Sequence, residues 1–178
     1  MRLNNIDLDR VQQTIAAIRQ DPAQARRPQR VAVTWNFAEG EPQMRATVTV
    51  EGRPQTLEAD SPSFLGGQGL RPGPIPYCLF AFASCFAGSF AGAAAELGVR
   101  LTYLQVAAET VVDFTRPLGL GENPPAEGLT FIVEAATDGD PARLEEVKAL
   151  AYRRCPAVYC ITNPIPLTVQ LKTPSSGS

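Results

Sequence analysis

The chain carries no charged side chain from Pro72 to Ala95, although charged residues are frequent on both sides of this segment. Its apolar positions neither alternate nor fall on one narrow stripe. A helix that is apolar on every side must be buried on every side. Pro76 suits a first helical turn, and Gly98 suits a left-handed residue just after a helix end. The pattern therefore predicts one long helix from Pro76 to Glu96, roughly 30 Å in length.

Two interpretations of this helix are open. Its length is sufficient for a membrane span. However, apart from Arg71 no Lys/Arg cluster flanks it to set an orientation, and its many Ala, Gly and Ser residues allow another helix to approach closely. We therefore expect a central core helix, packed by a sheet on one side and by a helix on the other, with no contact to a membrane.

Alternating and amphipathic patterns flank the central helix on both sides. Before it, they predict a helix over 7–20 and an antiparallel meander of strands at 30–37, 44–50 and 55–59. After it, they predict strands at 101–114, 129–136 and 165–171, and a helix that begins at Asp140–Pro141 and ends near Arg154. The order of elements predicts an α+β protein with one domain over residues 1–171 and a disordered tail over 172–178.

Composition excludes several classes of function. The 178 residues have a net charge of −2 and show no basic patch, so we expect no nucleic-acid partner. No signal peptide is visible, which favours the cytoplasm, where thiols stay reduced. The chain has no histidine, which excludes His-based triads and His metal ligands. The Gly66–Gly69 segment lacks the Lys-Ser/Thr of a phosphate-binding loop, so we interpret it as a flexible connection and expect no cofactor.

Four cysteines remain as candidates for chemistry, namely Cys78, Cys85, Cys155 and Cys160. Their spacings of seven and five residues do not provide the close pairs of a Cys₄ zinc site, so we expect no metal. Cys78 and Cys85 are roughly 10 Å apart along one helix and cannot form a disulfide. A redox pair would join the two helices, most simply Cys85 with Cys155. Alternatively, all four are small buried apolar residues.

The motifs around two of these cysteines resemble those of the OsmC/Ohr family of thiol-dependent peroxidases, in its OsmC-like branch. Gly73–Tyr77 leading into Ala83-Ser84-Cys85 is similar to the start of the family's central helix, and Cys155-Pro156 to its second cysteine. Further similarities, in family order from Leu8 to Leu171, are Leu65-Gly66-Gly67, Asp140-Pro141 and Asn163-Pro164-Ile165-Pro166.

The resemblance implies a fold, a partner and a reaction. The fold would be an intertwined homodimer with antiparallel sheets around two long buried central helices. Cys85 would reduce an organic hydroperoxide and become a sulfenic acid, which Cys155 would resolve as a disulfide. A dithiol, of the lipoyl type in the Ohr branch, would then reduce the disulfide. An arginine from the N-terminal strands, held by a glutamate early in the central helix, would favour the Cys85 thiolate.

The chain departs from this pattern where the helix glutamate is expected, because Ile75 stands there. Arg45 is our candidate for the activating arginine, with Arg53 as the rival. Glu39, Glu41 and Asp60, which lie in loops, are our candidates for the carboxylate that orients this arginine. Without a secured cation, burial would raise the pKa of Cys85.

Two functional hypotheses follow for the chain. In the first, Cys85, Cys155 and Arg45 form the site of a hydroperoxide reductase. In the second, a non-catalytic OsmC-like dimer binds an apolar small molecule or has a structural role, and its cysteines are inert. The roles of Cys78 and Cys160 remain open in both.

Overall fold

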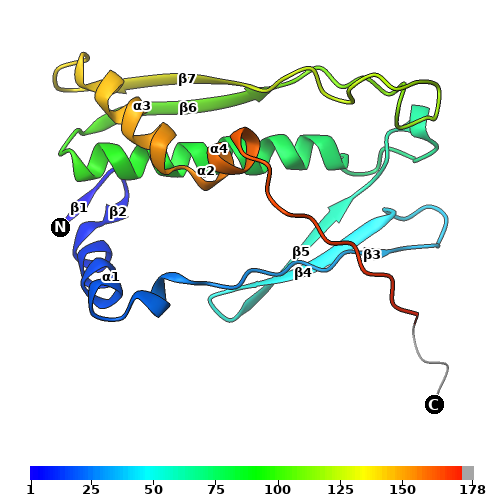
Figure 1. Ribbon diagram of the computed structural model, residues 1–178, viewed down its shortest axis with the longest axis horizontal. Helices are drawn as coiled ribbons and strands as arrows, with labels where there is room; N and C mark the ends of the chain where they lie inside the picture. The colour runs from blue at the N-terminus through cyan, green and yellow to red at the C-terminus, as the bar shows by residue number, and fades with distance from the viewer. Residues whose placement is uncertain (174–178) are drawn as a thin grey trace.

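The long apolar helix α2 (Pro74–Glu96) lies at the centre of one half of the molecule. The computed structural model describes residues 1–173. In Figure 1, α2 lies along the antiparallel pair of β6 (Leu101–Glu109) and β7 (Thr130–Thr137), with α3 (Arg143–Arg154) and α4 (Pro156–Thr162) in front of it. The contacts of α2 are mainly with β6, α3 and α4. The expectation of a core helix between a sheet and other helices is confirmed.

The elements after α2 pack against one side of this helix. Strands β6 (Leu101–Glu109) and β7 (Thr130–Thr137) form an antiparallel pair, and α3 (Arg143–Arg154) and α4 (Pro156–Thr162) follow. Gly98 adopts a φ of 70°, as predicted for the residue that ends α2. The hydrophobic core lies where these elements meet, and its most deeply buried side chains include Phe86, Phe90, Ala94, Val147, Ala151 and Cys155.

The elements before α2 form a second half of the molecule (Figure 1). They are β1 (Arg2–Leu3), β2 (Ile6–Asp7), α1 (Leu8–Gln20), the 3₁₀ turn η1 (Pro22–Ala25), β3 (Thr34–Trp35), β4 (Met44–Val50), β5 (Arg53–Ala59) and the 3₁₀ turn η2 (Ser63–Leu65). Strands β3, β4 and β5 pair in that order as the predicted antiparallel meander. Asn4 ties the N-terminus to the other half, because its side chain bonds the backbone of Val99 and Leu101.

The connection from the meander to α2 is held by a buried carboxylate. Asp60 is 1% exposed, and its Oδ2 accepts hydrogen bonds from the backbone N–H groups of Gln68 and Leu70. These bonds, that of Leu70 above all, lower the pKa of Asp60. Gly67 packs so closely on Ser61 that a Cβ would lie 1.9 Å from the Ser61 carbonyl oxygen. The connection is therefore a clamped turn, and our interpretation of Gly66–Gly69 as flexible is wrong.

The structure corrects several predicted elements. Only Thr34–Trp35 of the predicted strand 30–37 pairs, and β6 ends at Glu109 instead of continuing to residue 114. The central helix begins at Pro74, two residues before the predicted start at Pro76. Helix α3 begins at Arg143 instead of Asp140, because Asp140–Ala142 form a turn in which the Asp140 side chain accepts a hydrogen bond from the Ala142 N–H. The strand at 165–171 is wrong for the single chain, which is extended and unpaired there. Helix α4 and strands β1 and β2 were not predicted.

The predicted tail extends past the part of the chain that the structure describes. Residues 172–173 are exposed and form no regular structure. The remaining residues of the predicted tail, 174–178, lie outside the described residues.

The chain leaves part of its apolar surface uncovered. Along α2, Phe80 is 70% exposed, and Ala81, Ser84 and Gly88 on the same side are also exposed. The expectation that α2 is buried on every side is thus wrong within one chain. The unpaired segment 165–171 likewise exposes its alternating apolar side chains, with Leu167 at 88% and Val169 at 86%.

In length and composition, α2 also meets the requirements of a membrane span. It has 23 residues, and its most apolar 18-residue stretch has a mean hydropathy of 1.7. The fold uses its C-terminal half as the wall of a core, since Phe86, Phe90 and Ala93–Ala95 are buried against the elements that follow.

Replacement of Phe90 by alanine tests this assignment of the core. Phe90 is 2% exposed, and deletion of a buried phenylalanine ring lowers the free energy of unfolding by about 3–5 kcal/mol. Urea unfolding of Phe90→Ala measures the loss. Phe64→Ala is the control, since Phe64 is 66% exposed, and its loss should stay below about 1 kcal/mol. Equal losses in the two variants would contradict the assignment.

Candidate functional site

Cys85 and Cys155 lie together, although 70 residues separate them in the chain. Cys85 is partly buried near the middle of α2, and its Sγ lies 3.7 Å from the Sγ of Cys155. Both are free thiols. A disulfide requires a sulfur–sulfur distance of about 2.05 Å. An approach of roughly 1.7 Å, without unfolding of α2, would therefore join them.

The break between α3 and α4 positions Cys155. Proline has no N–H and cannot continue a helix, yet it suits a first helical position. Pro156 therefore ends α3 and starts α4, and Cys155 becomes both the C-cap of α3 and the N-cap of α4. The Cys155 N–H donates to the Ala151 carbonyl at 2.9 Å, and its own carbonyl accepts from Tyr159 at 3.1 Å. Cys155 is only 2% exposed.

The surroundings shift the pKa values of Cys85 and Cys155 in opposite directions. Burial and the neighbouring thiols raise the pKa of Cys85, although the Ala157 N–H partly opposes this. Burial also opposes ionisation of Cys155, but hydrogen bonds from the Val158 N–H, the Ser89 hydroxyl, the Cys85 thiol and the Ala157 N–H together lower its pKa. Within one chain, the surroundings thus favour ionisation of Cys155 over that of Cys85.

Arg45 does not reach this pair within one chain. It lies on β4, and no hydrogen bond or ion pair among residues 1–173 links it to Cys85. Its guanidinium donates from Nε and Nη2 to Oε1 of Glu58, at 3.1 and 2.8 Å, across the β4–β5 pair. Arg53 stands exposed at the β4–β5 turn and forms no ion pair with any residue the structure describes.

Glu58 joins two arginines. Its second oxygen, Oε2, accepts from Arg71 Nε at 2.9 Å, and both guanidinium groups, Arg45 first, lower the pKa of Glu58. The Glu58 carbonyl accepts a 2.7 Å hydrogen bond from the hydroxyl of Tyr77, in the first turns of α2. This cluster of Arg45, Glu58 and Arg71 contains two positive charges and one negative charge. The meander thus carries a carboxylate-held arginine. Ile75 stands where the family resemblance implied a glutamate.

The carboxylates named from the sequence do not hold Arg45. Glu41 bonds the Asn36 amide at 2.8 Å, Asp60 closes the turn before α2, and Glu39 is exposed. We missed Glu58, although a signal was available. A two-residue turn at Glu51–Gly52 fixes the register that places Glu58 opposite Arg45.

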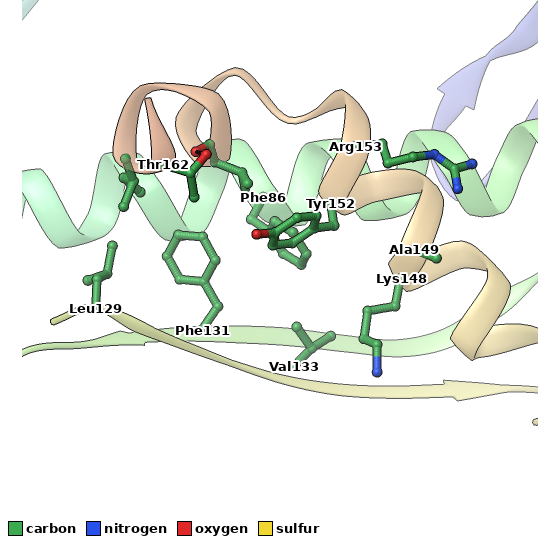
Figure 2. Close-up of a pocket in the computed structure, with 11 residues that line it drawn as sticks. Phe86, Leu129, Phe131, Val133, Lys148, Ala149, Tyr152, Arg153 and Thr162 are labelled. Carbon is green, nitrogen blue, oxygen red and sulfur yellow. Dashed lines mark hydrogen bonds between the residues drawn. The ribbon is translucent and has the colours of Figure 1, made fainter. Parts of the chain in front are cut away.

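Two apolar cavities adjoin α2. The larger, of about 1000 Å³, lies between α2 and the loops around it, and its wall includes Cys78, Leu79 and Phe82 of α2 with Phe64, Phe114 and, as a charged member, Arg71. A smaller cavity of about 540 Å³ lies between α3, α4 and β7. Figure 2 shows the Phe86, Phe131 and Tyr152 side chains gathered in it, whereas the Arg153 guanidinium points away. Leu129 and Ile161 border both cavities.

The other two cysteines are exposed. Cys78 lines the larger cavity, and Cys160 lies in α4, five residues after Cys155. Among residues 1–173, no three Cys, Asp or Glu side chains gather in an arrangement suited to a metal ion.

The chain belongs to the OsmC-like protein family, whose profile matches residues 67–170. The resemblance stated from the sequence is thereby confirmed. No curated protein sequence matches the chain.

Solved structures show the same fold. A putative osmotic stress induced and detoxification response protein from Psychrobacter arcticus has a TM-score of 0.56 at 14% identity, over 76% of this chain and 90% of its own. An organic hydroperoxide resistance protein OsmC from Legionella pneumophila has a TM-score of 0.52 at 17% identity, over 76% and 91%. One from Elizabethkingia anophelis has a TM-score of 0.50 at 16% identity, over 75% and 88%. The predicted α+β, OsmC-like fold is confirmed.

The pH dependence of stability tests the role of Glu58 in the cluster. Because the folded-state pKa of Glu58 is lowered, its stabilising effect is complete above the ordinary pKa of a glutamate and disappears as the pH falls through the folded-state pKa. We therefore expect Glu58→Gln to unfold at lower urea than wild type at neutral pH, and the difference to shrink toward acid pH. Glu134→Gln, in β7 and without an ion pair among residues 1–173, is the control. A pH-independent difference would contradict the assignment.

Proposed function

We propose that the protein is a thiol-dependent peroxidase that reduces organic hydroperoxides through Cys85 and Cys155. The observation that carries the proposal is the 3.7 Å distance between the two sulfurs, one on the central helix and one at a helix break that leaves room for a small movement. Membership of the OsmC-like family supports it, as do the names of two structural neighbours, which are organic hydroperoxide resistance proteins.

The reaction has two thiol steps. The Cys85 thiolate attacks the distal oxygen of the hydroperoxide, the O–O bond breaks, and the alkoxide takes up a proton and leaves as an alcohol. Cys85 becomes a sulfenic acid. The Cys155 thiolate then attacks the Cys85 sulfur, and the hydroxyl group leaves as water. The lowered pKa of Cys155 supports its role as the resolving nucleophile. A dithiol reductant, of the lipoyl type in the Ohr branch, returns both cysteines to thiols.

Cys85 requires help to ionise, because burial raises its pKa. An arginine next to a thiol has the opposite effect. The Arg45 guanidinium, oriented by Glu58, is suited to this role, but its hairpin lies away from Cys85 within one chain. We infer that Arg45 of one chain acts on Cys85 of a second copy.

The uncovered apolar surfaces support such a homodimer. Phe80 and the small residues of α2 beside it form an exposed apolar face where a second copy of α2 would fit. The unpaired segments 30–33 and 165–171 have the alternation of strands, and a partner chain supplies the pairing that the single chain lacks. The dimer thus completes both the core and the site.

The larger cavity supports an organic substrate. Its wall is predominantly apolar and includes Cys78 and Phe82. These two residues lie on the same side of α2 as Cys85, which follows Phe82 by about one helical turn. Burial of an alkyl or aryl group in it contributes roughly 0.8 kcal/mol per methylene. Hydrogen peroxide has no such group. Cumene and tert-butyl hydroperoxide should therefore be better oxidants than hydrogen peroxide, in the cytoplasmic setting expected from the sequence.

A second candidate is a non-catalytic dimer that binds an apolar small molecule. The raised pKa of Cys85 and the cavity of about 1000 Å³ favour it, since an un-ionised thiol is unreactive and an apolar cavity suits a ligand. The two candidates differ in whether Cys85 reacts with a hydroperoxide.

Peptide mapping after oxidation decides between them. We expect cumene hydroperoxide to consume two thiols per chain and to produce a Cys85–Cys155 disulfide. Cys155→Ser should stop at the sulfenic acid of Cys85, which a dimedone adduct detects, and Cys85→Ser should consume no hydroperoxide. Cys85 that remains reduced under excess hydroperoxide, in folded protein, would leave the binding protein as the better account.

Replacement of Arg45 by methionine tests the activating cation. Each unit by which the pKa of Cys85 rises lowers the thiolate fraction at neutral pH about tenfold. We expect alkylation of the Cys85 peptide by iodoacetamide to slow by at least this factor in Arg45→Met. Arg53→Met is the matched control, since Arg53 belongs to the same hairpin and should leave the rate unchanged. Slowing in Arg53→Met alone would transfer the role to Arg53.

A further inference from the structure

Two arginines share the carboxylate of Glu58, and each of them holds one oxygen. Arg45 lies directly opposite Glu58 in the β4–β5 pair and donates from both Nε and Nη2 to Oε1, at 3.1 and 2.8 Å. Arg71 Nε donates to Oε2 at 2.9 Å. A guanidinium frequently forms two parallel hydrogen bonds, one to each oxygen of a carboxylate. Arg45 does not form this arrangement, because Arg71 occupies the second oxygen.

Both partners of the Arg71–Glu58 contact are anchored at the start of α2. Arg71 Nη1 donates to the Leu70 carbonyl at 2.8 Å, and the Leu70 N–H donates to Oδ2 of the buried Asp60 at 2.9 Å. The clamped turn before α2 therefore also fixes the Arg71 guanidinium. The Tyr77 hydroxyl, from α2, donates to the Glu58 carbonyl at 2.7 Å and holds the backbone of Glu58.

The position of the Arg45 guanidinium depends on how the carboxylate is divided. If Oε2 were free, the two donors of Arg45 would spread over both oxygens, which turns the guanidinium and shifts it along the carboxylate. A misplacement of about 1 Å is enough to slow a catalysed step by roughly a hundredfold. The second arginine also leaves a net positive charge in the cluster, which a simple Arg45–Glu58 pair would lack. A nearby positive charge favours a thiolate.

We propose that Arg71 is a positioning residue for the activating arginine. It occupies Oε2 of Glu58, confines the Arg45 guanidinium to Oε1, and so fixes the place from which Arg45 acts on Cys85 of the second chain. The proposal rests on the proposed function, in which Arg45 is the activating cation. It gives the clamped turn before α2 a role in the site, because this turn holds Arg71 beside Glu58.

Two other roles of Arg71 lead to different expectations. Arg71 lines the larger cavity, and a residue that only shapes the way to Cys85 would change the rate at which the ionised thiol reacts. A charge that acted on the thiol directly would lower the pKa of Cys85 whether or not Glu58 is present. A positioning residue changes the pKa of Cys85 only through Glu58 and leaves the rate of the ionised thiol unchanged.

The pH profile of Cys85 alkylation by iodoacetamide, followed on the Cys85 peptide of the full-length protein, separates these roles. A rise of half a unit in the pKa of Cys85 lowers the thiolate fraction at neutral pH about threefold. We expect Arg71→Met to slow alkylation at neutral pH by at least this factor, with the same plateau at high pH. Arg71→Lys should recover most of the rate. Arg100→Met, which removes another exposed, ion-paired arginine, should behave as the wild type.

A double-mutant cycle shows whether Arg71 acts through Glu58. In a Glu58→Gln background, Arg71→Met should cause no further slowing, because residues that act through one contact are not additive. Equal slowing by Arg71→Met with and without Glu58, or a change confined to the plateau, would overturn the proposal. So would an unchanged profile in Arg71→Met when Arg45→Met slows alkylation, and this result would leave the activating role of Arg45 intact.

The NMR signal of the Arg45 Nε–H group separates a failure of this proposal from a failure of the proposed function. In Arg71→Met, the release of Oε2 should shift this signal, whereas Arg100→Met should leave it in place. If Arg45→Met does not slow alkylation, the activation assigned to Arg45 fails. A shifted Arg45 signal in Arg71→Met then still supports the positioning by Arg71, and an unshifted signal overturns it. Neither measurement uses a hydroperoxide, so the outcome of the peroxidase test does not affect them.

Discussion

The structure depends on one constraint, which is that α2 is apolar on every side and longer than the chain's own elements can cover. Its C-terminal half is buried by β6, α3 and α4, and its other side exposes Phe80 and the small residues near it. Exposed apolar surface of this extent is costly in water. The same helix carries Cys85. In the proposed homodimer, one second chain would both cover α2 and complete the site.

Packing on α2 also determines the chemistry of the cysteine pair. Burial makes ionisation of Cys85 unfavourable, whereas Cys155 receives hydrogen bonds because Pro156 places it at a helix break beside Ser89. The surroundings within one chain thus favour ionisation of Cys155 over that of Cys85. The charge that would reverse this order is on the other half of the molecule, where Glu58 holds two arginines. In the proposed mechanism, this carboxylate-held arginine takes the place of the helix glutamate that Ile75 replaces.

The sequence predicted the elements whose patterns are local. The extent of β4 and the existence of α1 and α2 follow from periodicity, proline and turn residues, and the Cys85–Cys155 proximity follows from the family motifs. The strand at 165–171 failed because alternation shows that a segment can pair but not that its partner lies in the same chain. Helix α4 was missed because its seven residues are too few for a periodic signal. Glu58 required the hairpin register, and the pKa order of the two thiols required the tertiary contacts of Ser89, Ala157 and Val158.

The central claim is that the active site is shared between two chains, and subunit mixing tests it most directly. An Arg45→Met chain retains Cys85, and a Cys85→Ser chain retains Arg45. When the two variants are unfolded and refolded together, half of the dimers formed by random pairing are mixed, and each mixed dimer has one complete site. The account predicts recovery of roughly a quarter of the wild-type hydroperoxide reductase activity. Activity no higher than that of the two variants refolded separately would contradict a shared site.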